Sequence, residues 1–155
     1  MTPSNYLFAY GTLMAAVGRF APSGLGAAER TRLAREGRLV GGAMMAGRLY
    51  DLGSYPGLVD GTVGDSSAVM VHGELWWLAE PAATFTWLDQ YEGIDAARPE
   101  AGEYRRVVRP LVGPLVWPSH AKQVHAEDVE AAWVYLYTGD VTSARLIARG
   151  DWLAP

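Results

Sequence analysis

The alternation of hydrophobic and polar residues along this chain predicts mainly β-strands. It is clearest in the range 68–78, where successive residues point to opposite faces of an extended chain. One face carries Val69, Val71, Gly73, Leu75 and Trp77, and the other carries Met70, His72, Glu74 and Trp76. The sequence therefore predicts a strand here, directly before a segment with helical spacing.

Four further segments have strand character. The apolar run Tyr6–Tyr10 is closed by Gly11, which predicts a buried strand that enters a turn. The other strands are expected at residues 38–49, with an interruption at Gly41-Gly42, at 104–112 and at 129–138. The last strand places Trp133, Tyr135 and Tyr137 on one side. This aromatic row suits a core or a pocket, and the core is favoured because aromatic side chains bury large areas.

Three segments have helical character. Residues 23–36 are rich in alanine, arginine and glutamate and precede Gly37, which predicts a largely exposed helix. A helix of about three turns is expected at 81–93. A short helix is expected at 142–149, ended by Gly150.

The remaining segments are expected to be loops. They are Pro56-Gly57, the range 61–67, and an irregular insertion at 113–128 that carries two prolines. Strands outnumber helices and no internal repeat is present, which favours an α+β fold with a strongly curved or closed, mostly antiparallel β-sheet. A chain of 155 residues is expected to form a single domain, 1–155.

The segment Trp87–Gly93 places an ionisable carboxylate where burial penalises its charge. Pro81 suits the first position of the helix that precedes it. Phe85, Leu88 and Glu92 then fall on one face, so the face that buries the first two also carries Glu92 inward. Desolvation and the negative end of the helix dipole would both raise the pKa of Glu92. A raised pKa would let this carboxylate exchange protons near neutrality.

Two alternatives to this interpretation stay open. Glutamates in a last helical turn are more often solvated or hydrogen-bonded to a neighbouring loop than catalytic. Asp89 lies three residues before Glu92 on nearly the same side of the helix and competes for the role. Short acidic side chains commonly bond backbone groups locally, so the spacing favours Glu92.

Composition and charge narrow the classes of function. The chain has no cysteine, which excludes a disulfide, a thiol nucleophile and a cysteine-ligated zinc site. Its formal net charge of −4 argues against nucleic-acid binding, which needs clustered positive charge. The densest basic group, Arg105, Arg106 and Arg109, is predicted to be a solvated strand face. Without a secretory signal or a run of about 20 apolar residues, we expect a cytoplasmic protein that does not bind membranes.

Several known site types do not fit the sequence. His72-Gly73-Glu74 resembles half of a zinc deaminase motif, but the cysteine ligands are missing. His120 and His125 are five residues apart, which does not stack them on a helix face as metal ligands. The chain also has no Gly-x-Ser-x-Gly elbow and no phosphate-binding loop. What remains is a carboxylate and a turn rich in exposed backbone.

That turn, Tyr10-Gly11-Thr12-Leu13, and Glu92 make the sequence resemble the γ-glutamylcyclotransferase-like (AIG2-like) family. Other matching segments, in order, are Gly47–Tyr50, Tyr55–Gly57, Val71–Trp76, Leu88–Gly93, Tyr104–Arg106 and Trp133–Tyr135. Together they cover about residues 6–138, and their joint order is more specific than any one of them.

The resemblance implies a small mixed fold built on a β-barrel with flanking helices. It also implies an enzyme that converts γ-glutamyl amides to 5-oxoproline and a free amine. The α-amine of the substrate attacks its own γ-carbonyl carbon, so the reaction requires no enzymic nucleophile, metal or cofactor. The implied partner is a small γ-glutamyl compound, and the oligomeric state does not follow from the sequence.

The resemblance also assigns roles to individual residues. Glu92 would be the general acid/base that takes a proton from the α-amine and returns it to the leaving nitrogen. Backbone N–H groups of Gly11, Thr12 and Leu13 would hold substrate oxygens. Tyr10 and Tyr104 would line the pocket through packing and hydroxyl hydrogen bonds, and Tyr135 is a weaker candidate. Because variable function concentrates on loops, we expect the insertion at 113–128 and the exposed helix after Met14 to select the leaving amine.

Two other functions stay open from the sequence. A protein with the same pocket could bind a small amino-acid derivative, or act through protein partners, without turnover. Water could also replace the α-amine as nucleophile, which would make a γ-glutamyl amide hydrolase.

Overall fold

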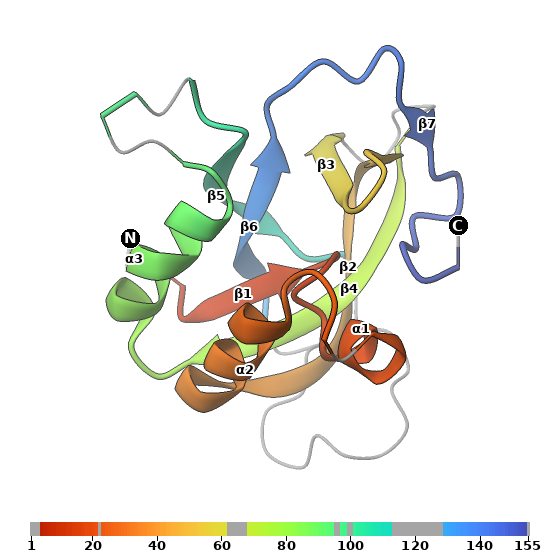
Figure 1. Ribbon diagram of the computed structural model, residues 1–155. Coiled ribbons are helices and arrows are strands. Elements are labelled where there is room, and N and C mark those ends of the chain that lie inside the picture. Colours follow the sequence, from red (N-terminus) through yellow and green to blue (C-terminus); the bar gives the residue numbers. More distant parts are fainter. Residues whose placement is uncertain are drawn as a thin grey trace.

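The computed structural model describes residues 4–21, 23–61, 68–94, 97–98, 101–112 and 129–154. Its elements in chain order are β1 (Tyr6–Ala9), α1 (Ala15–Phe20), α2 (Ala27–Glu36), β2 (Gly37–Asp51), β3 (Pro56–Asp60), β4 (Val69–Leu78), α3 (Pro81–Tyr91), β5 (Tyr104–Pro110), β6 (Ala131–Tyr137) and β7 (Arg145–Leu146). The expected α+β class, with a strongly curled sheet and few helices, is confirmed (Figure 1).

The strands form a sheet in the order β3-β2-β4-β1-β6-β5, and β7 pairs with the end of β2. All the strand pairs are antiparallel except β1 with β6, which run parallel. The long strand β2 carries a register shift between Leu39 and Gly41, close to the interruption expected at Gly41-Gly42. A bulge of this kind bends a strand, and Figure 1 shows β2 and β4 curving together through the molecule.

The sheet is buried on both faces around β1. Phe8 and Tyr10 belong to one hydrophobic cluster, which includes Leu75 of β4 and Val134 of β6. Leu7 and Ala9 belong to a second cluster, in which Leu33 of α2, Phe85 and Leu88 of α3, and Trp76 of β4 are also buried. Burial on both faces explains why Tyr6–Tyr10 is a continuous apolar run rather than an alternating one. On β6, Tyr135 is buried in the second cluster and Trp133 and Tyr137 pack against it, so the aromatic row faces the core as favoured.

Two of the predicted helices are confirmed. The helix expected at 23–36 is α2, which starts at Ala27 and has Gly37 as its C-cap. Helix α3 starts at Pro81, as expected, and Gly93 lies two residues beyond its end with φ +74°. A positive φ after the last turn is the usual reason for glycine at this position.

Two local expectations are wrong, and one helix was not expected. Residues 142–149 do not form a helix, because β7 pairs there with the end of β2. Pro56 and Gly57 begin β3 rather than a loop, and Gly57 leaves no room for a side chain because a Cβ would lie 2.9 Å from that of Tyr137. Helix α1 was not expected, since it has only six residues and no capping side chain of its own. The insertion at 113–128, with His120 and His125, and residues 62–67 lie outside the described ranges.

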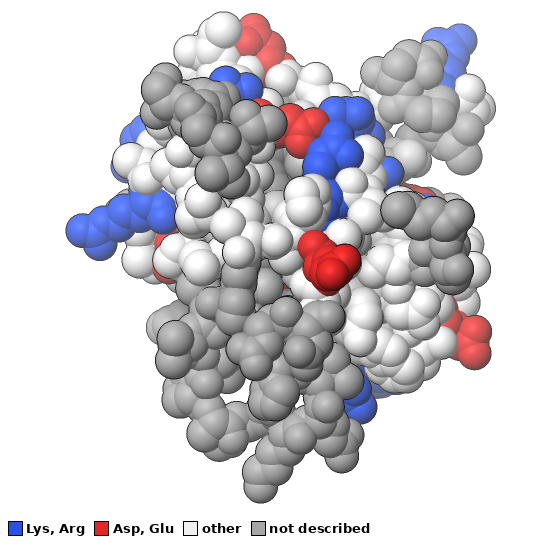
Figure 2. Space-filling view, turned by 180° about the vertical axis from the view of Figure 1, so that it is seen from behind, with Lys and Arg blue, Asp and Glu red and all other residues white. Residues whose placement is uncertain are grey.

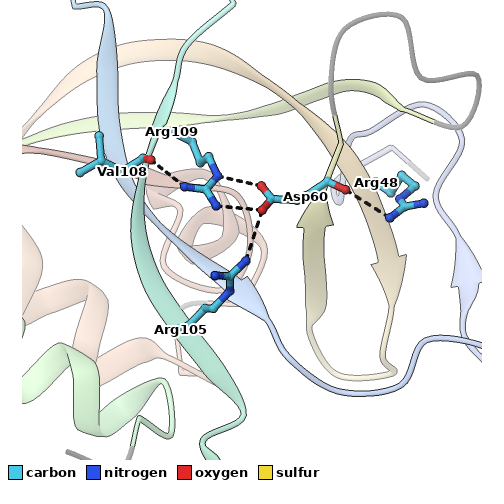
Figure 3. A network of polar contacts seen from close by, with 5 residues as sticks. All are labelled: Arg48, Asp60, Arg105, Val108 and Arg109. Atoms are coloured by element: carbon cyan, nitrogen blue, oxygen red, sulfur yellow. Dashed lines mark hydrogen bonds and ion pairs between the residues drawn. The ribbon is translucent and has the colours of Figure 1, made fainter. Parts of the chain in front are cut away.

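An ion-pair cluster connects the two outer strands β3 and β5 (Figure 3). Asp60 at the end of β3 accepts two hydrogen bonds from Arg109, each of 2.8 Å, and one of 3.2 Å from Arg105. Both arginines lie on β5, and Arg48 of β2 donates to the Asp60 carbonyl oxygen at 3.2 Å. These contacts hold the edges of the curled sheet together. The expectation of a solvated basic face is therefore met only in part, since Arg105 is exposed but paired.

We expect Asp60→Asn to lower the free energy of unfolding by about 1 kcal/mol, since the Asp60 side chain is 45% exposed and water screens its ion pairs. The loss should shrink at high salt. Urea unfolding at low and high ionic strength measures both. The double variant Asp60→Asn with Arg109→Gln should lose less free energy of unfolding than the two single variants lose together. Full additivity of the two losses would contradict the bridging role of Asp60.

The described surface carries both signs of charge. On the face shown in Figure 2, acidic and basic side chains lie next to one another. None of the helices in the described ranges has both the length and the apolar character needed to cross a membrane. The absence of nucleic-acid binding stays a prediction from the sequence.

Candidate functional site

A cavity of about 150 Å³ lies where the turn after β1 meets the C-terminal end of α3, the start of β3 and strand β6. It is lined by all seven residues expected from the sequence, namely Tyr10, Gly11, Thr12, Leu13, Glu92, Tyr104 and Tyr135. Residues more than 120 positions apart in the chain therefore meet at one place, because β1 lies beside β6 in the sheet.

Glu92 is the C-cap of α3, and its N–H donates to the Leu88 carbonyl oxygen at 2.9 Å. Phe85 and Leu88 are buried on the same helix face, as the spacing predicted, and Glu92 itself is partly buried. Among the residues that the structure describes, none is hydrogen-bonded to its carboxyl group. Burial raises the pKa of Glu92 to about 8, with smaller contributions from the charges of Glu103 and Asp89. This carboxyl group can therefore gain and lose a proton near neutral pH.

Two buried charged side chains hold the turn that follows β1. Glu74 of β4, 2% exposed, accepts hydrogen bonds from the N–H groups of Ala15 at 2.5 Å and Ala16 at 3.1 Å. These are the first N–H groups of α1, which otherwise lack partners. Arg30 of α2, 9% exposed, donates to the Thr12 carbonyl oxygen at 2.7 Å. The turn is therefore fixed from β4 on one side and from α2 on the other.

This arrangement leaves the backbone donors of the turn unused. Within the described ranges, the N–H groups of Gly11, Thr12 and Leu13 donate to no protein acceptor. Gly11 is required by a close contact, since a Cβ there would lie 2.9 Å from the ring of Pro56. Its φ is not positive, so the close contact and not the backbone conformation requires a glycine here. The turn can offer these N–H groups to an oxygen of a ligand.

Two of the tyrosines that were expected in the cavity, Tyr10 and Tyr104, use their hydroxyl groups to hold the scaffold. Tyr10 donates to the Tyr135 carbonyl oxygen at 2.6 Å and accepts from the Leu58 N–H at 3.1 Å. Tyr104 donates to the Pro56 carbonyl oxygen at 2.8 Å. Burial raises the pKa of Tyr10 and Tyr104, so both hydroxyls stay protonated at neutral pH. The expected packing role fits this geometry, but the hydroxyls are already engaged by protein atoms.

Asp89 does not bond the backbone locally, and this expectation is wrong. Its carboxylate accepts hydrogen bonds from Arg106 at 2.8 and 3.2 Å and from the Tyr135 hydroxyl at 2.7 Å. The guanidinium group of Arg106 also packs against the rings of Phe85 and Trp133, 4.0 and 4.4 Å from their centroids, so Arg106 is not part of a solvated face. Asp89 thus forms an ion pair with Arg106 of β5, whereas Glu92 has no such partner among the described residues.

We expect Tyr10→Phe to lower the free energy of unfolding by about 2 kcal/mol, because it leaves the buried Leu58 N–H without an acceptor. Thermal and urea unfolding measure the loss. Tyr50→Phe is a suitable control, since Tyr50 is less buried and its hydroxyl forms no hydrogen bond with any residue that the structure describes. A similar change for both variants would contradict a specific role of the Tyr10 hydroxyl.

A comparison with protein families identifies the family of this chain. The model of the family "Gamma-glutamyl cyclotransferase, AIG2-like" matches residues 7–154. The chain belongs to the AIG2-like γ-glutamyl cyclotransferase family. The γ-glutamylcyclotransferase family protein YtfP of Escherichia coli strain K12 is 33% identical over 106 residues, which cover 68% of this chain and 67% of YtfP.

Solved structures agree with this AIG2-like assignment. The solution NMR structure of ytfP from Escherichia coli has a TM-score of 0.53 at 28% identity and covers 96% of each chain. The crystal structure of an AIG2-like protein from Mus musculus has a TM-score of 0.53 at 16% identity. That match covers 89% of this chain and 78% of the mouse protein, and it shows a shared fold.

The cavity is also lined by residues that were not expected from the sequence. They are Leu25, Tyr55, Pro56, Tyr91 and Glu103. Tyr55 and Pro56 stand in a segment that carried the family resemblance, which was a signal that they belong near the site. Glu103 directly precedes Tyr104, but nothing in the local pattern marks it. Within the described ranges, no group of three or more potential metal ligands is close enough to hold an ion.

Proposed function

We propose that this protein is a γ-glutamylcyclotransferase that releases 5-oxoproline and a free amine from γ-glutamyl compounds. One observation supports the proposal above the others. A single cavity contains a carboxyl group with a pKa near neutrality and a turn whose N–H groups have no acceptor among the described residues. A proton carrier and a set of oxygen-binding donors are what ring closure of a γ-glutamyl amide requires.

Glu92 carries the protons in this proposal. As a carboxylate it takes a proton from the α-ammonium group, and the resulting amine attacks the γ-carbonyl carbon. Once the C–N bond has formed, the nitrogen loses a second proton and the leaving nitrogen receives one through Glu92, so that the amide bond breaks. The released amine takes up the other proton, and the total number of protons on substrate and products is unchanged. A pKa of about 8 allows one group to serve as base and then as acid near neutral pH.

The turn at Gly11–Leu13 binds oxygen atoms of the glutamyl group. Its N–H groups can hold the α-carboxylate or the oxygen that becomes negative during the attack. Because both reacting atoms belong to one molecule, the main requirement is a folded conformation of the glutamyl chain. A cavity of about 150 Å³, walled by Tyr10 and Tyr104, restricts the chain to compact conformations.

A panel of γ-glutamyl dipeptides and amides tests the proposal directly. The purified protein is incubated with each compound, and 5-oxoproline, glutamate and the free amine are quantified. We expect equal amounts of 5-oxoproline and amine. Labelled water separates the alternatives, because hydrolysis places the label in the new carboxylate of glutamate and cyclisation places none in 5-oxoproline. Saturable binding without any product would instead support a non-catalytic pocket.

A further inference from the structure

A second carboxylate, that of Glu103, stands at the mouth of the cavity. Its main chain is fixed on both sides, because its N–H donates to the Gly93 carbonyl oxygen at 3.1 Å and its carbonyl oxygen accepts from Thr138 at 2.9 Å. Its side chain accepts a hydrogen bond from the Tyr55 hydroxyl. Glu103 is nevertheless exposed, in contrast to Glu92 deeper in the same cavity. The carboxylate of Glu103 is therefore held in place at the mouth, where a ligand that enters or leaves the cavity would contact it.

The size of the cavity places the leaving group at this mouth. A volume of about 150 Å³ is comparable to a protein cavity that holds one benzene-sized ligand. The glutamyl part, which closes to a five-membered ring, fills a space of this size. The group attached to the leaving nitrogen must then extend outward, past the exposed residues Leu25 and Glu103.

The charges at the mouth are not balanced. The described lining includes the carboxyl groups of Glu92 and Glu103 but no lysine, arginine or histidine. The guanidinium group of Arg30 lies behind the turn and donates to the carbonyl oxygens of Thr12, Leu25 and Ala21. Arg106 is paired with Asp89. A positive group at the mouth would therefore meet the negative charge of Glu103, for which the described lining holds no cation, and a carboxylate at the mouth would be repelled.

We propose that Glu103 selects the leaving group, so that the protein prefers γ-glutamyl amides whose amine carries a second, positively charged group and disfavours those with a carboxylate. This inference rests on the proposed function and names its substrate class, the γ-glutamyl conjugates of diamines and similar cations. Tyr55 supports the selection by orienting the carboxylate. The hydrogen bond to Glu103 and, to a smaller extent, burial raise the pKa of Tyr55 to about 12, so its hydroxyl remains a donor.

Three amides of nearly equal length test this selection. They are the γ-linked aminobutyl, butyl and carboxypropyl amides of glutamate, which place a cation, a neutral methyl group or an anion at the mouth. For the parent protein we expect kcat/KM to fall in that order, with roughly tenfold between successive compounds. In Glu103→Gln the kcat/KM values of the three amides should differ by no more than about threefold, and the value for the butyl amide should change least. Tyr55→Phe should reduce these differences in kcat/KM in part.

Glu80→Gln is the matched control, because it removes the same charge from an exposed glutamate at the opposite end of α3. It should leave the order unchanged. If the parent cyclises none of the three amides, the proposed function itself is wrong. If the parent cyclises the butyl amide without preferring the cation, or if the preference survives Glu103→Gln, the inference about Glu103 is wrong and the proposed function stands.

Discussion

Glu92→Gln is expected to lower kcat/KM for 5-oxoproline formation by about a thousandfold, the loss typical of removing a positioned general acid/base. The amide keeps the size of the side chain and its place at the end of α3, so the cavity should still bind the substrate. KM should therefore change much less than kcat. A variant that cyclises as fast as the parent would show that Glu92 is not the proton carrier.

The same assignment predicts the pH dependence of the parent protein. The carboxylate form of Glu92 is needed to accept the first proton, and the pKa of Glu92 in the folded protein is about 8. Since kcat/KM reports the free protein and the free substrate, it should rise with pH up to about 8 and fall again at higher pH, where the α-ammonium group of the substrate has already lost the proton that Glu92 accepts. Glu103→Gln should move this rise to lower pH, because the charge of Glu103 contributes to the raised pKa of Glu92.

Asp89→Asn separates the two acidic residues of α3. Asp89 is engaged by Arg106 and Tyr135, so its loss should destabilise the fold and reduce kcat/KM by no more than about tenfold. Glu80→Gln, at the other end of the helix, should be neutral. A thousandfold loss in Asp89→Asn with an active Glu92→Gln would reverse the assignment.

Unfolding experiments test the state of Glu92 without any substrate. Its pKa is raised from the ordinary 4.5 to about 8 in the folded protein, so folding favours the protonated form. The parent should therefore lose stability relative to Glu92→Gln as the pH rises from about 4.5 to about 8. We expect about 2 kcal/mol between pH 5 and pH 9, less than the full shift implies because the side chain is partly exposed. A pH-independent difference would mean that the carboxyl group has an ordinary pKa.

The features of the fold that could be predicted from the sequence are those with a local cause. The helix at 81–93 has a proline at its start and a glycine in positive φ after its end, so its limits are encoded nearby. The strand at 68–78 was visible from alternation, although both of its faces are largely buried. By contrast, α1 is capped by Glu74, which is 58 and 59 residues away in the chain, so no local pattern marks it. Residues 142–149 similarly depend on pairing with β2.

The candidate site shows the same division. The inward position of Glu92 followed from helix spacing, and the structure adds that Glu103 and Asp89 raise its pKa further. The contribution of Glu103 to the pKa of Glu92 could not be predicted, and neither could the pairing of Asp89 with Arg106. Both depend on β5 and the residue before it lying beside α3. The aromatic residues Tyr10 and Tyr104 were placed in the cavity by resemblance. Their hydroxyl partners, Leu58 and Pro56, are 48 residues away and only the structure identifies them.

Glu74→Ala is expected to cause the largest loss of stability, about 3 kcal/mol, and to disturb the turn at Gly11–Leu13. Glu74 is 2% exposed, and it holds the first two N–H groups of α1 and the indole N–H of Trp76 at 3.3 Å. Removing it leaves these buried donors unsatisfied and opens a small cavity beneath the turn. Burial raises the pKa of Glu74, so its contribution to stability is fully present below its unfolded pKa. The penalty should therefore be largest in acid and shrink as the pH rises through the raised pKa.

The turn also gives Glu74→Ala a functional effect. If the N–H groups of the turn bind substrate oxygens, a loosened turn should raise KM by about tenfold at temperatures where the variant is folded. Glu36→Ala is the matched control, because Glu36 accepts hydrogen bonds from Thr84 and Trp87 at the end of α2 but does not line the cavity. It should lose stability without a change in KM. An equal rise in KM for both variants would indicate general destabilisation, whereas a rise confined to Glu74→Ala would support the turn as the part of the site that binds the glutamyl group.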